Sequence, residues 1–371
     1  MNRILNIAVD ARSLAYPHGG IGRQVANLLR EFVSLESPHR FFLYSDRPFQ
    51  IGFPLPEQWK VRTGAVLRPG FSTLFSQVFF PVWALKDGID VFWSPYHILP
   101  LLLLPHVRKM VTVHDVGWKR FPRKMIPGST VESVLMPLSL RLADHIIAVS
   151  QFTRAEVQAL FPGVKCAIDV IYPAPSLTAD GHTDTCPLSN PYLLFVGSNV
   201  PRKNIKRMME AYIKYREVSP CPLDMVLVST YRWSSFSIEN FIEANNLQPC
   251  VHLIKNLDDR ALSSLYAHAR AVVLVSLYEG FGLPLVEAMQ WGVPLVASNS
   301  SSVAEIAGKA ALFVDPNDTD AIAEAFSHIT KDDALHAKLV HESKLRVRQF
   351  SWKQAAAETM ALITGDLAVA N

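Results

Sequence analysis

The feature that most constrains the fold is an alternation of short β-rich runs with amphipathic helical stretches, which occurs twice along the 371 residues. Such alternation is typical of parallel sheets whose strands are connected by helices. Strands are expected in the first half at 4–9, 40–44, 91–94, 109–113, 145–148 and 167–171. In the second half they are expected at 192–196, 225–228, 251–253, 271–274, 293–297 and 311–314.

Helices are expected between these strands, among them 22–35, 131–143, 205–218, 261–267, 284–291 and 319–329. A stretch rich in Pro, Ser, Thr, Gly and Asp separates the two series, which is the composition of a linker. The chain is also too long for one ordinary core. We therefore predict an α/β protein with an N-terminal domain over 1–172, a linker over 173–190 and a C-terminal domain over 191–351. Ligands of open parallel sheets bind at the carboxyl ends of the strands, so we expect a cleft between the two sheets.

Composition excludes several classes of protein. A hydrophobic content of 49% with 19% charged residues is that of a globular chain and not of a disordered one. Residues 1–185 hold 19 Lys+Arg against 14 Asp+Glu, or +5, and the remainder holds 17 against 19, or −2. This mild basic bias fits an anionic membrane surface or phosphorylated substrates, and it is too weak to indicate nucleic-acid binding.

The cysteines and the apolar runs predict a cytoplasmic protein. Cys166, Cys186, Cys221 and Cys250 show no zinc-type spacing, so we expect reduced thiols. The N-terminus begins directly on a strand-like run without a secretory leader. The longest apolar run, 98–105, has eight residues, whereas a spanning helix needs about 20. We expect no membrane-spanning segment.

The strongest local signal is the run 279–288, Glu-Gly-Phe-Gly-Leu-Pro-Leu-Val-Glu-Ala, which follows the strand 271–274. Two glycines allow close approach of a ligand to the backbone, and Pro284 suits the first position of a helix. The free N–H groups at the helix start favour an anion, so the run predicts a diphosphate cradle between Glu279 and Glu287. The alternative is a tight strand-to-helix turn in which Glu287 only complements the helix dipole.

A second segment, 196–204, places Arg202 and Lys203 after the first strand of the second half. Fixed cations at this position can stabilise a departing diphosphate without a metal ion. A Pro-Arg-Lys turn by itself is usually a solvated loop. Together with the glycine segment, this turn indicates a binding site for the diphosphate.

The first half carries two weaker signals. His18-Gly19-Gly20-Ile21-Gly22 resembles a phosphate-approach loop, although a glycine-rich turn alone is weak evidence. His114 follows the strand 109–113, at a carboxyl end, where a structural histidine and a functional one are equally expected.

These segments, in this order, resemble glycosyltransferase family 4, whose members have the GT-B fold of two facing Rossmann-like domains with a deep inter-domain cleft. The resemblance covers essentially the whole chain. Its most specific element is the pair of glutamates Glu279 and Glu287 with the glycines between them. The other matching segments are 9–12, 19–22, 113–115, 148–153, 196–197, 202–204, 276–284, 287–288 and 350–352.

The resemblance implies a role for each matching position. Lys203 and Arg202 would neutralise the donor diphosphate, and Glu279 and His114 would contact the transferred sugar. Glu287 would bind the ribose hydroxyls. The remaining donor-binding positions are Gly19, Gly20, Gly197, Ser198, Lys255, Asn256, Gly280, Phe281, Gly282 and Leu283. The last helix, 352–371, would cross back onto the first domain.

One departure from the family pattern concerns the diphosphate. Many members carry Arg directly after the glycine that ends the strand, where this chain has Ser198. Neutralisation would therefore depend more heavily on Arg202 and Lys203.

The subgroup that this chain resembles contains bacterial mannosyltransferases of O-antigen and exopolysaccharide synthesis. It implies a retaining, metal-independent transfer of mannose from GDP-mannose, without a cofactor, to a growing, polyprenyl-diphosphate-linked glycan. Without a clearly placed second carboxylate, we expect front-face attack assisted by the departing phosphate. The alternatives are another nucleotide-sugar enzyme of the same fold, such as an epimerase or a phosphorylase, and a non-catalytic nucleotide-sugar-binding scaffold.

Membrane association is a separate expectation. The apolar stretch 71–85 and the mixed basic and apolar segment 121–126 could seat the first domain on the anionic cytoplasmic face of the inner membrane. A buried core helix would explain the first stretch equally well.

Overall fold

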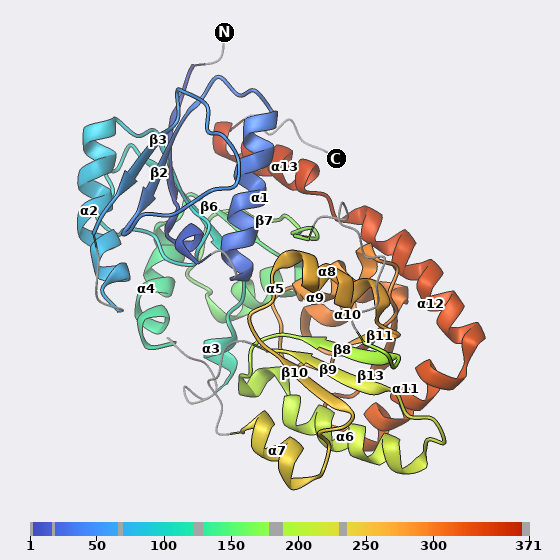
Figure 1. Cartoon of the computed structure of the whole chain (residues 1–371). Coiled ribbons are helices and arrows are strands. Elements are labelled where there is room, and N and C mark those ends of the chain that lie inside the picture. Colours follow the sequence, from blue (N-terminus) through green and yellow to red (C-terminus); the bar gives the residue numbers. More distant parts are fainter. Residues whose placement is uncertain are drawn as a thin grey trace. The chain divides into compact units, whose positions relative to one another are not determined.

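The computed structural model describes residues 3–16, 19–65, 70–121, 129–177, 188–229 and 236–365 (Figure 1). The chain forms two compact units. Unit 1 comprises 1–119, 128–174 and 351–371, and unit 2 comprises 120–127 and 175–350.

Unit 1 is built on a seven-stranded parallel sheet with the order β3-β2-β1-β4-β5-β6-β7. The chain leaves β1 towards one edge, through β2 and β3, and then returns to place β4 on the other side of β1. The strands are β1 (Asn6–Asp10), β2 (Arg40–Ser45), β3 (Lys60–Thr63), β4 (Val91–Ser94), β5 (Arg108–Val113), β6 (His145–Ala148) and β7 (Ile168–Val170).

The two faces of this sheet are covered by different helices, and alternate residues of one strand enter different cores. Ile7 and Val9 pack with α1 and α13, whereas Ala8 packs with α2 and α4. Because both faces are buried, the inner strands are largely apolar runs. The helical elements are η1 (Arg12–Ala15), α1 (Gly20–Ser34), α2 (Ser72–Asp87), α3 (Gly117–Arg120), α4 (Ser129–Leu142), α5 (Gln151–Leu160) and α13 (Trp352–Thr364).

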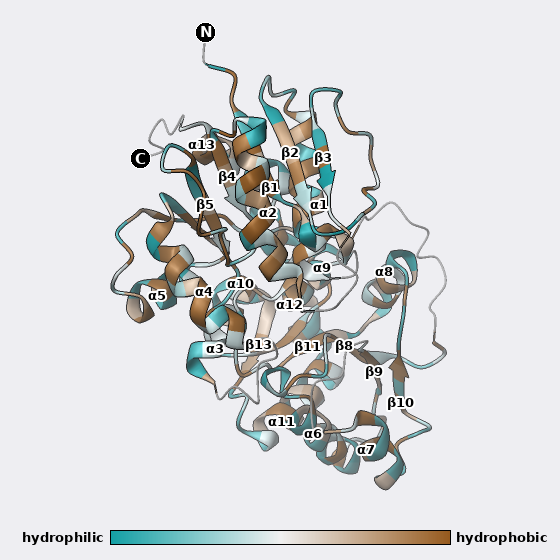
Figure 2. Cartoon of the chain, turned by 90° about the vertical axis from the view of Figure 1, so that its left-hand side faces the viewer, coloured by the Kyte–Doolittle hydropathy of each residue, from teal (hydrophilic) through white to brown (hydrophobic). Residues whose placement is uncertain are grey.

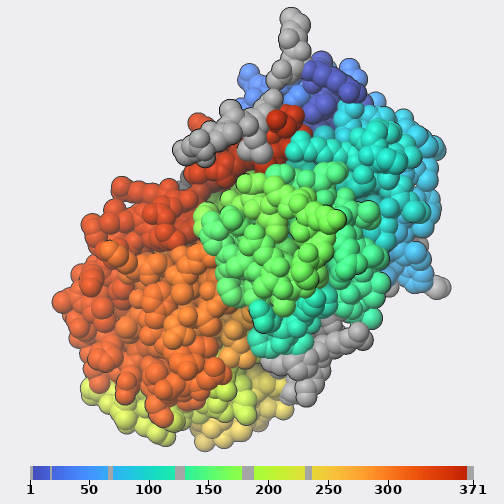
Figure 3. All heavy atoms as spheres, turned by 180° about the vertical axis from the view of Figure 1, so that it is seen from behind, coloured from blue at the N-terminus to red at the C-terminus, as the bar shows by residue number. Residues whose placement is uncertain are grey.

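The C-terminal helix belongs to unit 1 although it follows all of unit 2 in the sequence. α13 packs on α1, and its buried Ala356 and Ile363 join the same core as Val9. Figure 3 shows red residues from the end of the chain against blue residues from its beginning.

Unit 2 has a six-stranded parallel sheet with the order β10-β9-β8-β11-β12-β13. Its strands are β8 (Tyr192–Val196), β9 (Asp224–Val228), β10 (Val251–Ile254), β11 (Ala271–Leu274), β12 (Leu295–Ser298) and β13 (Ala311–Val314). Its helical elements are η3 (Pro201–Lys203), α6 (Ile205–Val218), α7 (Ile238–Ala244), α8 (Asp259–His268), α9 (Leu283–Gln290), α10 (Ser301–Ala307), η4 (Gly308–Ala310), α11 (Thr319–Lys331), α12 (Asp333–Arg346) and η5 (Val347–Gln349).

The predicted class of two parallel α/β sheets is confirmed, and every expected strand is present. β3 was not predicted. It is a short edge strand whose residues are largely exposed, so it lacks the apolar run by which buried strands are detected.

The apolar stretch 71–85 forms α2, but a buried core helix describes only part of it. Phe80 and Ala84 are buried, while Leu74, Val78 and Leu85 are exposed. In the described parts of the chain, no helix combines the length and apolar character needed to cross a bilayer.

Candidate functional site

The central strands of unit 2 create a natural place for a ligand. β8 and β11 are hydrogen-bonded neighbours, yet the chain leaves β8 towards β9 and reaches β11 only after crossing back. Such a switch in strand order leaves a crevice at the carboxyl ends, where ligands of open α/β sheets bind. The two segments singled out in the sequence follow β8 and β11.

Backbone and amide hydrogen bonds tie the two loops together. The N–H of Leu277 donates to the carbonyl oxygen of Arg202 at 2.8 Å. The side-chain amide of Asn204 donates to the carbonyl oxygens of Val275 at 3.0 Å and Pro316 at 2.7 Å. Asn204 has a left-handed backbone, which asparagine tolerates better than most residues, and it ends η3 before α6 begins. The loop that carries both cations is thereby fixed to the end of β11.

Glu279 is the centre of a compact charged cluster. Its Oε1 lies 2.6 Å from Nζ of Lys203 and accepts a hydrogen bond from Oγ of Ser276 at 2.7 Å. Its Oε2 accepts from Nη1 of Arg202 at 2.9 Å. Among the described residues, the cluster therefore joins two cations to one carboxylate. Outside it, the N–H of Glu279 donates to Oγ of Ser301 at 3.1 Å, which fixes the backbone.

The electrostatics of the cluster keep Glu279 ionised. Burial alone would raise the pKa of its carboxyl, but Lys203, Arg202 and the hydrogen bond from Ser276 outweigh burial and lower the pKa to about 2. The group is therefore a hydrogen-bond acceptor at neutral pH. It cannot serve as a general acid there.

The glycine segment lies directly after Glu279 and opens α9. Gly282 has φ of +97° and forms the N-cap, a conformation that a side chain would strain. The N-cap glycine supplies no side-chain cap, and Pro284 lies in the first turn of the helix. The turn of Gly280, Phe281, Gly282 and Leu283 therefore begins a helix whose first amides suit an anion.

Glu287 is buried on α9 and bonded to a residue that the sequence analysis did not identify. Tyr266 of α8 donates its hydroxyl hydrogen to Oε2 of Glu287 at 2.8 Å. Tyr266 is fully buried, and Glu287 is 5% exposed to solvent. This contact goes beyond a helix-dipole role, because it orients the carboxylate from a second helix.

The other donor-binding candidates of unit 2 occupy two separate places. Gly197 and Ser198 follow β8, and a Cβ on Gly197 would lie 3.6 Å from Cε of Lys203. Lys255 and Asn256 follow the edge strand β10, two strands away from β8. Lys255 forms an exposed ion pair with Glu239 at 2.7 Å and does not join the cluster around Glu279.

His114 of unit 1 lies at the end of β5 and is held as a neutral ring. Burial and the neighbouring His97 lower the pKa of His114 to about 4. Its Nε2 lies 2.7 Å from the carbonyl oxygen of Pro95, which can only accept, so Nε2 carries the proton and Nδ1 is an acceptor. His97, which the sequence did not single out, accepts from the N–H of His114 at 3.4 Å.

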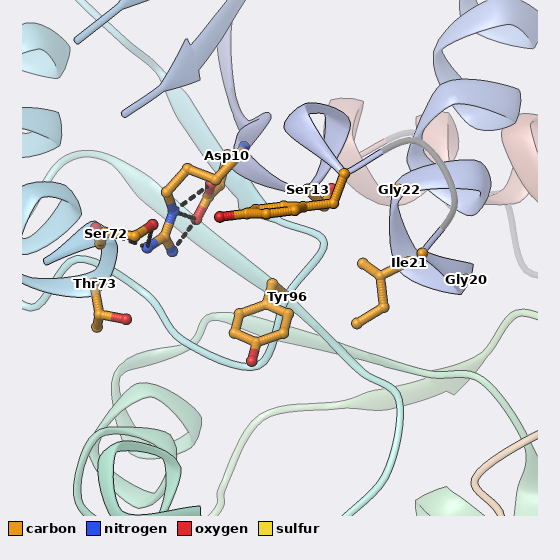
Figure 4. A pocket seen from close by; sticks show the side chains of 11 residues that line it. Asp10, Ser13, Gly20, Ile21, Gly22, Ser72, Thr73 and Tyr96 are labelled. Carbon is orange, nitrogen blue, oxygen red and sulfur yellow. Dashed lines mark hydrogen bonds and ion pairs between the residues drawn. The ribbon is translucent and has the colours of Figure 1, made fainter. Parts of the chain in front are cut away.

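A cavity of about 380 Å³ lies at the corresponding switch in the sheet of unit 1, where β1 and β4 are neighbours (Figure 4). Gly19 and Gly20, at the start of α1, line it. His18 lies outside the described residues. The cavity also contains Asp10, Arg12 and Tyr96, and sequence reasoning gave none of them a role.

Two family models together match most of the chain. One described as Glycosyltransferase Family 4 matches residues 18–177, and one described as Glycosyl transferases group 1 matches residues 185–346. O-antigen chain mannosyltransferase B of Escherichia coli is 32% identical over 295 residues, which cover 75% of each chain.

Solved structures show the same two-domain fold. Sucrose-phosphate synthase from Thermosynechococcus elongatus aligns over 98% of this chain and 99% of its own, with 20% identity and a TM-score of 0.79. HepE from Anabaena, in complex with UDP and glucose, aligns over 98% of this chain and 100% of its own, with 16% identity and a TM-score of 0.70. These likenesses confirm the predicted GT-B fold class.

Proposed function

The chain belongs to glycosyltransferase family 4, and from that premise we propose that it transfers mannose from GDP-mannose to a growing bacterial surface glycan. The relative O-antigen chain mannosyltransferase B supports the sugar and the pathway class. The observation that carries the proposal is the cluster in which two cations share one carboxylate at the strand switch of unit 2. Two fixed cations side by side at a strand end suit a nucleoside diphosphate.

In the proposed reaction, Arg202 and Lys203 stabilise the diphosphate as its bond to the anomeric carbon breaks. Fixed cations that oppose developing negative charge lower the barrier without reorganisation, and they act here in place of a metal ion. The ionised Glu279 accepts hydrogen bonds from the hydroxyls of the transferred sugar. Glu287, oriented by Tyr266, accepts them from the ribose.

We propose retention of the anomeric configuration by front-face attack. The acceptor oxygen bonds to the anomeric carbon on the side from which the phosphate oxygen departs, and the acceptor proton passes to that oxygen. The low pKa of Glu279 excludes it as a proton donor to the leaving phosphate, so in this scheme the proton of the acceptor takes that place. The neutral His114, with Nδ1 as an acceptor, is proposed to bind a hydroxyl of the same sugar.

The proposal is tested first by binding. In a thermal-shift panel of GDP- and UDP-sugars, GDP-mannose is expected to raise the melting temperature most, since a ligand of the native state stabilises it by mass action. A larger shift with UDP-glucose would contradict the donor assignment. No shift with any nucleotide sugar would contradict the function itself.

The catalytic roles are tested by substitution. Lys203→Ala and Glu279→Ala are each expected to lower transfer by about 100-fold or more while the protein stays folded. Lys206→Ala is the matched control, because Lys206 is exposed on the next helix and, within the described part of the chain, its one ion pair is with Glu210, one turn away. Near-normal turnover in either test variant would overturn the site. Donor hydrolysis without acceptor distinguishes an enzyme from a binding scaffold.

We further propose that the acceptor is linked to a lipid and that unit 1 binds an anionic membrane surface. The supporting feature is the α2–α4 face, a set of exposed apolar residues on α2 and its N-cap, on α4 and on the loop between the two helices: Phe71, Leu74, Val78, Phe79, Val82, Leu85, Leu102, Val131, Val134, Leu138 and Leu142. Figure 2 shows both helices on one side of the unit. The side chains of Gln77 on α2 and Ser139 on α4 both form hydrogen bonds with the backbone of Leu99, in the loop between the two helices. Residues 122–126 of the predicted basic segment lie outside the described residues.

Liposome flotation tests this second proposal. The chain is expected to float with vesicles that contain anionic lipid, because exposed Lys86 and Arg141 flank the apolar face. Leu74→Glu with Leu85→Glu should abolish flotation, whereas Val218→Glu, at an exposed apolar residue of unit 2, should not. Equal flotation of all three proteins, or none of the wild type, would contradict membrane binding by this face.

A further inference from the structure

The loop that follows β4 contacts His114 in two ways. The carbonyl oxygen of Pro95 lies 2.7 Å from Nε2 of His114, and Nδ1 of His97 accepts from the backbone N–H of His114 at 3.4 Å. The rings of His97 and His114 meet edge to face, with centroids 5.4 Å apart and planes inclined by 84°. One residue of the loop therefore fixes the proton of the His114 ring, and another fixes its backbone and packs against the ring itself.

The polar chemistry of His97 is directed at this neighbour. The residue is 6% exposed, and within the described part of the chain its side chain forms a hydrogen bond with His114 alone. Because a backbone N–H can only donate, Nδ1 of His97 is an acceptor and Nε2 carries the proton. Burial lowers the pKa of His97, so the ring is neutral near pH 7 and Nδ1 keeps its lone pair. A buried neutral histidine bonded in this way has the character of a support for His114.

The loop that carries this support is itself fixed at both ends. At its start, the buried hydroxyl of Ser94 lies 2.5 Å from the carbonyl oxygen of Tyr96 and 2.8 Å from that of Ile98. At its end, the N–H of Leu99 donates to Oγ of Ser139 on α4 at 2.9 Å. A side chain on a loop held in this way can orient a neighbour, because its own position is set by hydrogen bonds to the rest of the unit.

Resting on the transferase function proposed above, we propose that His97 is a positioning residue for His114 and thereby sets how efficiently the sugar of the donor is used. In the proposed reaction, Nδ1 of His114 accepts a hydrogen bond from a hydroxyl of the transferred sugar. An imidazole nitrogen directs its lone pair along one line in the plane of the ring, so a rotation of the ring weakens that bond. His97 acts through the backbone and the ring of His114 and makes no contact with the sugar.

The test is a double-mutant cycle on donor turnover by the whole chain, with the nucleotide sugar that stabilises it most in the thermal-shift panel. His97→Phe keeps a ring in the buried place and removes the acceptor, so kcat/KM for the donor should fall about fivefold, the loss of one hydrogen bond. In a His114→Ala background the same substitution should have no further effect, because no ring remains to be positioned. The Kd of the free nucleoside diphosphate, which lacks the sugar, should stay unchanged in every variant.

A second pair of variants distinguishes the two nitrogens of His97. His97→Asn places an amide oxygen near the position of Nδ1 and should keep kcat/KM within about twofold of the wild type. His97→Gln carries the same amide one carbon farther out and should behave like His97→Phe. This pair keeps the test decisive if His97→Phe does not fold. His145→Phe is the matched control, because His145 is equally buried, on β6, and its ring bonds Asp169 instead.

Four results would overturn the inference: normal turnover in His97→Phe, an equal loss in both backgrounds, equal activity of His97→Asn and His97→Gln, or a loss of the same size in His145→Phe. An equal loss in both backgrounds would mean that His97 is merely structural. Each result can occur while the wild type transfers sugar, and then only the role of His97 is wrong. A wild type that transfers no sugar from any nucleotide sugar would contradict the transferase function, and the inference that rests on it would fall with it.

Discussion

The candidate sites of the two units occupy equivalent places in their sheets and differ in charge balance. In unit 1 the switch between β1 and β4 holds one arginine against one carboxylate. In unit 2 the switch between β8 and β11 holds an arginine and a lysine against one carboxylate. Both sites lie at the carboxyl ends of parallel strands, and they differ in the balance of cations and carboxylates among the described residues.

The two carboxylates also differ in what they stabilise. Asp10 is the counter-ion of a guanidinium that is itself buried. Glu279 holds two cations: the side chain of Arg202 is 23% exposed, whereas that of Lys203, at 11%, is about as buried as that of Arg12 at 10%. We expect the first pair to contribute mainly to stability, because Asp10 balances a single buried cation. We expect the second cluster to serve mainly the proposed binding and catalysis, because Arg202 remains partly exposed.

The largest expected effect in stability is that of Asp10→Asn. Leaving the buried Arg12 without its counter-ion should cost about 3–5 kcal/mol in the free energy of unfolding, measured by urea denaturation. The double variant Asp10→Asn with Arg12→Met should recover much of this loss, because it removes the unpaired charge. A loss below about 1 kcal/mol in the single variant would show that the Asp10–Arg12 pair contributes little to stability, which would contradict the difference expected between this pair and the Glu279 cluster.

The second prediction concerns the close packing of η1 against α1, which shapes the cavity of unit 1. A Cβ on Gly22 would lie 2.6 Å from the carbonyl oxygen of Ser13 and 2.7 Å from that of Tyr16. Gly22→Ala should therefore cost about 1–3 kcal/mol in the free energy of unfolding. Gly52→Ala is the control, because a Cβ there meets nothing within 4 Å. Equal stability of the two variants would show that η1 can move away.

The third prediction is the pH dependence of the Glu279 cluster. The folded pKa, about 2, lies below the ordinary value of about 4.3 for an unfolded glutamate. Its contribution is therefore complete above about pH 5 and is lost as the pH falls towards 2. The stability difference between wild type and Glu279→Gln, from urea unfolding, should shrink by about 1 kcal/mol from pH 7 to pH 3.5. A constant difference would indicate that the carboxylate is not held by the cations.

The smallest expected effect is that of Tyr266→Phe, which removes the hydrogen bond to Glu287 and keeps the ring. Because Tyr266 acts through Glu287, the KM for the donor should rise about threefold with little change in kcat. Steady-state kinetics at varied donor concentration measures this. Tyr192→Phe is the control, since its buried hydroxyl bonds the carbonyl oxygen of Leu265 instead. An equal change in both variants would indicate a general packing effect.

Much of the fold followed from local sequence patterns. The strands of both sheets were recognisable because strands buried on both faces are short apolar runs. The exposed edge strand β3 lacked that run and was missed. The turn around Gly282 and the helix after it were predictable because glycine and proline restrict the backbone locally.

Parts of the candidate site could not be predicted in the same way. Ser276, Tyr266 and His97 are ordinary residues in the sequence, and their importance depends on which loop or helix lies against them. The outer face of α2 is a further case, because apolar composition does not reveal whether a neighbour covers a residue.

The sequence by itself determined two parallel α/β domains, the cations after β8 and the paired glutamates after β11, because these depend on local periodicity and turn chemistry. Only the tertiary structure decided that Arg202 and Lys203 share Glu279, more than 70 residues away in the chain. It also placed Asp10 and Arg12, a pair only two residues apart, at the wall of the unit 1 cavity. Net charge at a site is set by which ionised groups come within a few ångströms of each other, and that proximity arises only when the strands are ordered in a sheet.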